Sequence, residues 1–146
     1  MSIALGSRVY FWSCRNQQNI VVKAAEKFED DFFCSVNWNS SGGHIALGSD
    51  QGVVDVVEGS TCSPLWTSKC HQERISAISW MNEYVFSTGS RDNTVRTFDL
   101  RKNQKSPLAV MAKHTQDVCG LKWSISGGFL ASGGNDNTIH IWDSRK

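Results

Sequence analysis

The sequence predicts an all-β fold built from repeated four-stranded sheets, and three observations carry that prediction. Segments that begin with two small residues superpose without gaps at Gly48, Gly89 and Gly133. Tryptophans that close alternating runs recur 42 and 43 residues apart, at Trp38, Trp80 and Trp123. Between these markers, short apolar or alternating runs are separated by Gly, Ser, Asn and Asp, with no sustained helical period. Together these features indicate a β-sheet repeat of about 43 residues.

The chain divides into four such units. Residues 1–25 are expected to form an incomplete unit, because 3–6 and 9–12 are a shortened copy of the pattern. Residues 33–68 and 74–111 each have room for four strands and are expected to form complete units. Residues 117–146 show runs at 118–123, 129–132 and 138–142, which predict three strands joined by turns at 126–128 and 135–137. The last unit is therefore also expected to be incomplete.

Four strands in about 43 residues is the signature of a WD40 propeller blade. Two complete and two incomplete blades amount to about three and a half, whereas propellers close with four to eight. We therefore expect a partial WD40 β-propeller that belongs to a longer ring. The alternative is a short product that associates with a second copy of itself.

Composition narrows the class of protein. The 146 residues carry a formal charge of +1, with 40% hydrophobic residues, so neither nucleic acid nor a membrane surface is an expected partner. No run approaches the length of a membrane span, and the N-terminus lacks a signal-peptide pattern. The five cysteines form no C-x-x-C pair, which argues against a zinc ribbon. We expect an intracellular, soluble protein whose cysteines are small core residues.

The last repeat contains a polar set in the pattern of a WD40 blade clamp. The Trp142 indole is expected to donate to Ser132, Ser132 to bond onward to His114, and Asp136 to orient His114. The alternative is a Ser-His-Asp hydrolase triad, but no G-x-S-x-G motif surrounds Ser132. We therefore expect a structural clamp, no enzyme activity, no metal site and no cofactor.

The preceding repeat keeps a similar set in a weaker form. His71, Thr88 and Asp92 stand at the corresponding positions, while Phe98 replaces the tryptophan and removes its donor. We expect His71 and Asp92 to act as a second structural clamp.

Residues 114–123 and 130–137 resemble the Fizzy family of anaphase-promoting-complex activators, of the Cdc20 and Cdh1 type. The runs 3–5, 9–12, 87–91 and 99–101 support the resemblance. It extends through nearly the whole chain but covers only the first half of that family's seven-bladed propeller. The resemblance implies a non-catalytic subunit that presents degron-bearing substrates to a ubiquitin ligase in the cell cycle, in nucleus and cytoplasm.

The resemblance also implies binding residues. Trp12 and Ile20 match the wall of a pocket for the destruction-box leucine, and Asn135 and Asn137 match residues that bond a KEN-box peptide. The groove between the second and third blades matches the site for ABBA-type peptides. Without a binding role, Trp12 and Ile20 would simply pack between blades, and Asn135 and Asn137 would serve only as ordinary turn residues.

Other functions remain open on the sequence alone. The family's C-box and Ile-Arg tail, which dock it onto the ligase, are not found in these residues, so at most partial recognition is expected. The ends of two repeats, 98–101 and 142–145, resemble the W-D-x-R motif by which other WD40 proteins join cullin-based ligases. A generic scaffold, or a truncated product without degron binding, is the remaining alternative.

Overall fold

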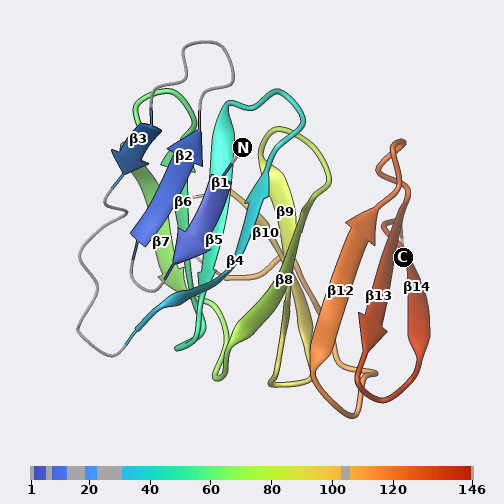
Figure 1. Ribbon diagram of the computed structural model, residues 1–146. Coiled ribbons are helices and arrows are strands. Elements are labelled where there is room, and N and C mark those ends of the chain that lie inside the picture. The colour runs from blue at the N-terminus through green and yellow to red at the C-terminus, as the bar shows by residue number, and fades with distance from the viewer. Residues whose placement is uncertain (1, 6–7, 13–18, 23–30, 103–105, 146) are drawn as a thin grey trace.

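The described part of the chain consists of antiparallel β-sheets (Figure 1). A computed structural model describes residues 2–5, 8–12, 19–22, 31–102 and 106–145, with side chains from residue 31 onward. All regular elements in these ranges are strands, which confirms the all-β prediction. Within the same ranges, no helix is long and apolar enough to cross a membrane.

The strands form four sheets in chain order, each a simple meander. The first sheet consists of β1 (Ser2–Leu5), β2 (Arg8–Trp12) and β3 (Asn19–Val22). The second consists of β4 (Phe33–Trp38), β5 (His44–Ser49), β6 (Val53–Glu58) and β7 (Pro64–Lys69). The third consists of β8 (Ile75–Trp80), β9 (Val85–Ser90), β10 (Val95–Asp99) and β11 (Ala109–Met111). The fourth consists of β12 (Val118–Trp123), β13 (Phe129–Gly134) and β14 (Ile139–Asp143).

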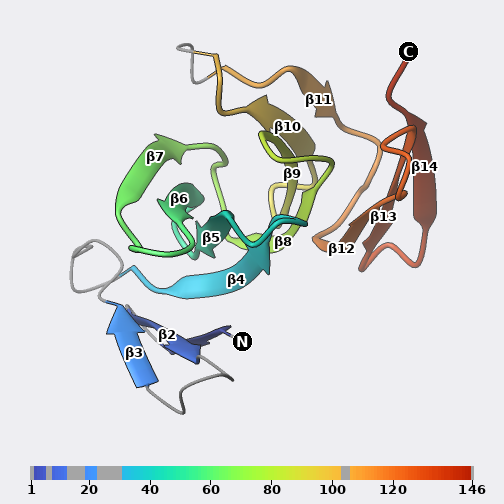
Figure 2. The ribbon, with the colours of Figure 1, turned by 90° about the horizontal axis from the view of Figure 1, so that it is seen from above.

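The sheets follow one another along an open arc (Figure 2). The first strands of the last three sheets, β4, β8 and β12, contact one another in sequence. β1 contacts β4 in the way that β5 contacts β8 and β9 contacts β12. β1 therefore takes the place of a second strand in its sheet.

In each of the last three sheets, the turn between the second and third strands contains one residue with positive φ. That residue is Gly52 at 77°, Asn93 at 67° and Asn137 at 61° in successive sheets. Glycine and asparagine are the residues that adopt this conformation most readily. The repeat thus preserves the backbone requirement of the turn while the residue type changes.

A glycine also sets how closely neighbouring sheets approach. A Cβ atom built on Gly89 would lie 2.7 Å from Cγ1 of Val118, on the first strand of the next sheet. Gly48 is in the same relation to Ile75. Because no side chain intervenes, the first strand of each sheet packs directly on its neighbour, and an apolar core fills the space beside it.

The repeated tryptophans bond to the preceding sheet. The Trp80 indole N–H donates to the backbone oxygen of Asn37 at 3.0 Å, and that of Trp123 donates to Oγ of Ser87 at 3.1 Å. Each tryptophan therefore buries a large ring and also satisfies its polar atom.

The expectation that the cysteines are core residues is wrong for two of the four described. Cys70 is buried, but Cys34 and Cys119 are exposed. Both stand at bulges, where one residue of a strand has no partner in the register. A bulged residue turns away from the sheet core, so its small apolar side chain does not imply burial.

Candidate functional site

The fourth sheet brings together the four residues of the sequence-derived clamp. Trp142 Nε1 donates to Ser132 Oγ at 2.9 Å, and Ser132 Oγ lies 2.8 Å from His114 Nε2. His114 Nδ1 is 2.9 Å from Asp136 Oδ2. The bonds run from the indole to the carboxylate without an unpaired polar atom, as a buried network requires.

Asp136 also fixes the turn on which it stands. Its carboxylate accepts the backbone N–H of Thr115 and of Thr138, both at 3.0 Å, and the Thr138 hydroxyl at 2.7 Å. These bonds, with that from His114, hold the pKa of Asp136 well below its usual range. The turn 135–137 is therefore attached to the loop before β12 through one charged group.

Catalysis by Ser132 does not fit this geometry. Ser132 is 2% exposed, and its hydroxyl is engaged by both Trp142 and His114. A nucleophile needs access to a substrate carbonyl beside donors that stabilise an oxyanion. The arrangement supports the structural interpretation over the hydrolase triad.

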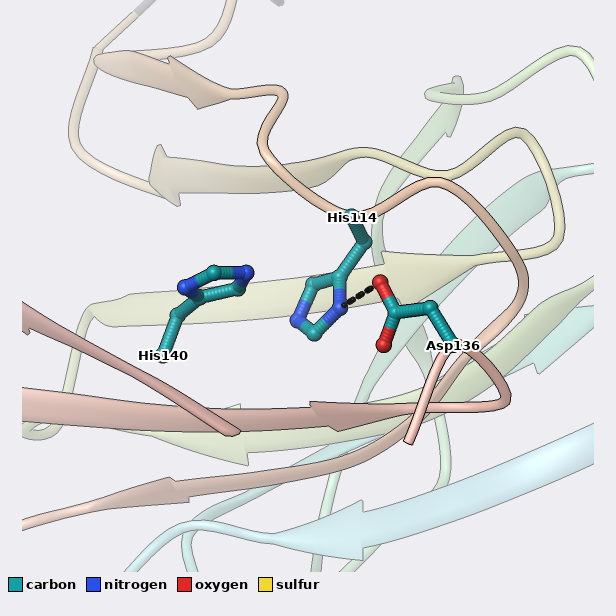
Figure 3. A group of neighbouring side chains, drawn as sticks. All are labelled: His114, Asp136 and His140. Carbon is teal, nitrogen blue, oxygen red and sulfur yellow. Dashed lines mark hydrogen bonds and ion pairs between the residues drawn. The ribbon is translucent and has the colours of Figure 1, made fainter. Parts of the chain in front are cut away.

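His140 joins the clamp from β14 (Figure 3). Its ring lies edge-on to His114, with 4.6 Å between centroids. Ligand atoms of His114, Asp136 and His140 lie within 4.8 Å of one another, the separation a metal ion would need. Both ring nitrogens of His114 are already hydrogen-bonded, however, so binding an ion would break the clamp. The donor set does not favour a metal centre.

The third sheet forms the parallel set around His71. Nδ1 of His71 lies 2.9 Å from Asp92 Oδ2, and Nε2 lies 2.7 Å from the Thr88 hydroxyl. Phe98 supplies no donor at the tryptophan position, and Thr88 instead bonds the backbone oxygen of Arg96 at 3.3 Å. The hydroxyl therefore keeps two partners although the indole is missing.

Acid is expected to weaken the fold through His71 and Asp92. Burial lowers the pKa of His71. Burial alone would raise the pKa of Asp92, but the hydrogen bonds from His71 and Thr94 outweigh it, so the pKa of Asp92 lies below its usual range. The unfolded chain protonates these groups below about pH 6.5 and about pH 4. At these pH values the unfolded chain binds more protons than the folded chain, so the free energy of unfolding decreases as the pH is lowered.

We expect the urea midpoint to decrease as pH falls from about 7 to 5, and again towards about 3. The variant His71→Gln, which is neutral throughout, should show a flatter first step. A midpoint that rises on acidification would contradict this assignment.

Asn135 and Asn137 occupy exposed positions on either side of Asp136. The backbone N–H of Asn135 donates to the Asp117 oxygen at 2.9 Å, and that of Asn137 to the Gly134 oxygen at 3.2 Å. Because Asp136 is locked by the clamp, the two carboxamides project from a fixed backbone. Exposed amides on a rigid turn can donate and accept hydrogen bonds with a polar peptide.

Trp12 and Ile20 lie on neighbouring strands of the first sheet. The register pairs Trp12 with Asn19 and Ile20 with Phe11. Their side chains are outside the described part of the chain, so their predicted role in a leucine pocket remains a prediction.

Each of the two W-D-x-R-like segments contains an ion pair between its own arginine and aspartate. Arg101 donates to both carboxylate oxygens of Asp99, at 2.9 and 2.8 Å, and Arg145 makes the same two bonds to Asp143. The bond from Arg145 lowers the pKa of Asp143 to about 2. Since each guanidinium is held by its own aspartate, the geometry does not single out docking on a ligase adaptor.

Two sequence families match the chain. Residues 105–143 match the WD domain, G-beta repeat, and residues 3–83 match the anaphase-promoting complex subunit 4 WD40 domain. WD repeat-containing protein srw1 of Schizosaccharomyces pombe is 38% identical over 143 residues, and Protein FIZZY-RELATED 3 of Arabidopsis thaliana is 36% identical over 144. The chain belongs to the Fizzy family of WD40 proteins. The alignments cover 98% and 99% of this Fizzy-family chain but 25% and 29% of the two relatives.

A solved structure supports the same assignment. A chain in the crystal structure of the mitotic checkpoint complex superposes with a TM-score of 0.92 at 34% identity. The match covers 99% of this Fizzy-family chain and 44% of that chain. The prediction of a partial WD40 propeller, and the resemblance to the Fizzy family, are confirmed.

Sequence reasoning missed two residues that support the site. His140 has no metal-ligand spacing to any cysteine, and only the pairing of β13 with β14 places it beside His114. Cys119 contacts Asn135 because of a bulge in β12. The recurrence of a cysteine or serine at 34, 76 and 119 is the one sequence signal that marks these bulges.

Proposed function

We propose that this Fizzy-family chain is part of a non-catalytic substrate-recognition subunit of the anaphase-promoting complex. In this role it binds degron peptides and presents their parent proteins to the ligase during the cell cycle, in nucleus and cytoplasm. Its partners are degron-bearing proteins and subunits of the ligase.

The observation that carries the proposal is the rigid turn 135–137. Asn135 and Asn137 face solvent from a backbone that Asp136 anchors through four hydrogen bonds. A short extended peptide loses entropy when it binds, so a recognition surface that is already ordered retains more of the contact energy. The turn supplies such a surface, with amides suited to a polar KEN-box segment.

Two further contacts complete the proposed binding surface. Trp12 and Ile20 are proposed to contact the leucine of a destruction box from the first sheet. The groove between the second and third sheets is proposed to accept ABBA-type peptides, with the rest of a longer ring supplying the opposite walls of the first two sites.

The proposed function is tested by the substitution Asn135→Ala. We expect the affinity for a fluorescent KEN-box peptide, measured by anisotropy, to fall about tenfold, because one hydrogen bond from a neutral carboxamide to the peptide is lost. The thermal midpoint should stay within about 1 °C, since the exposed carboxamide adds little to folding.

The control peptide carries Ala in place of each KEN residue. Equal binding of both peptides by the wild-type chain, or an Asn135→Ala variant with unchanged affinity, would exclude this turn as the KEN site.

A further inference from the structure

The Asn135 carboxamide accepts a hydrogen bond from the thiol of Cys119. Sγ of Cys119 lies 3.2 Å from Oδ1 of Asn135, within bonding distance for sulfur. The same sulfur is 3.6 Å from the backbone oxygen of Asp117, to which the Asn135 N–H donates. Backbone and side chain of Asn135 are thus both tied to the beginning of β12.

The bulge explains why Cys119 reaches this position. The register of β12 and β13 passes from Val118 directly to Gly120, which leaves Cys119 without a strand partner. A bulged residue turns its side chain along the rim of the sheet instead of into the ladder. Burial, with a smaller effect of Asp117, raises the pKa of the Cys119 thiol, so the sulfur keeps its proton.

The first strand of each of the last three sheets contains a bulge at this position. The bulges leave Cys34 in β4 and Ser76 in β8 at the corresponding positions. The Cys34 thiol faces Oδ1 of Asp50 at 3.9 Å, and the Ser76 hydroxyl donates to Oδ1 of Asp117 at 3.0 Å. In the second and fourth sheets the S–H group therefore meets a side-chain oxygen on the turn of its own sheet, whereas the Ser76 hydroxyl meets Asp117 in the loop before β12 of the next sheet.

The consequence for Asn135 is a fixed orientation of its amide. When Oδ1 accepts from Cys119, the NH₂ group is the part left to face a ligand, and it offers two donors. Asn137 differs, because its carboxamide makes no hydrogen bond within the described residues. One asparagine is therefore a fixed donor and the other is free to turn.

We infer that Cys119 is the positioning residue that makes Asn135 select hydrogen-bond acceptors in a bound peptide, namely carbonyl, carboxamide or carboxylate oxygens. This inference rests on the proposed function, since it concerns the same turn. Cys119 itself does not touch the peptide; it acts through Asn135.

A double-mutant cycle tests the inference in the full chain. Cys119→Ala is expected to weaken KEN-peptide binding about three- to tenfold, and Cys119→Ser, which keeps a donor, should restore it. In an Asn135→Ala background, Cys119→Ala should have no further effect. Cys34→Ala, at the same bulge position of the second sheet, is the matched control and should leave affinity unchanged.

A second readout needs no peptide. The Asn135 side-chain NH₂ signals in ¹⁵N–¹H spectra should be sharp in the wild type and in Cys119→Ser, and broadened in Cys119→Ala. Equal weakening by Cys119→Ala in both backgrounds, or NH₂ signals unchanged by the substitution, would overturn the inference. A wild-type chain that binds no KEN peptide contradicts the proposed function, while the NH₂ signals still decide whether Cys119 orients Asn135.

Discussion

The substitution Gly89→Val is expected to lower the free energy of unfolding by about 3 kcal/mol. A Cβ at this position would lie 2.7 Å from Cγ1 and 3.3 Å from the backbone oxygen of Val118. Neither atom belongs to a flexible chain end, and Val118 is fully buried. The added side chain can be accommodated only by moving β12 away from β9. Urea denaturation followed by far-UV circular dichroism measures the loss.

The fourth sheet supplies a matched control for this prediction. Gly133 pairs with Ile139 as Gly89 pairs with Val95, but an added Cβ at Gly133 would meet no atom within 4 Å in the described structure. Gly133→Val should therefore change the free energy of unfolding by less than about 0.5 kcal/mol. If both variants lose stability equally, the cost comes from strand conformation and not from contact between sheets.

The strands were predictable because the repeat and the two-residue alternation both report on burial. The predicted turns followed from Gly and Asn at positions that need positive φ, such as Gly127 and Asn137. The hydrophobic pattern did not predict the bulges, because an unpaired residue changes the register without changing that pattern. Cys34 and Cys119 were therefore assigned to the core, although both lie on the rim.

Identical motifs also differ in their surroundings, which sequence alone does not reveal. Asn93 donates from Nδ2 to the backbone oxygen of Thr115 in the loop that leads to the next sheet, at 3.3 Å. Asn137 stands at the same place in the repeat, without such a bond in the described structure. The pair shows that a turn asparagine can serve as a link between sheets or as a free recognition group.

Asp136→Ala is expected to lower the free energy of unfolding by about 3 kcal/mol. The carboxylate is the nearest acceptor for His114 Nδ1–H, at 2.9 Å, and it also accepts the backbone N–H groups of Thr115 and Thr138. The His114 ring is almost fully buried. Removing the carboxylate leaves this buried donor with only the Thr138 hydroxyl, 3.5 Å away, and frees the turn. The thermal midpoint and the urea midpoint should fall together.

The variant Trp142→Phe separates the carboxylate from the rest of the clamp. It reproduces Phe98, the residue at the same position of the third sheet, where Thr88 remains bonded to His71 without an indole donor. We expect a loss of about 1 kcal/mol, because Ser132 keeps one partner and the ring keeps its apolar contacts. If Trp142→Phe is as costly as Asp136→Ala, the indole stabilises the clamp as much as the carboxylate does.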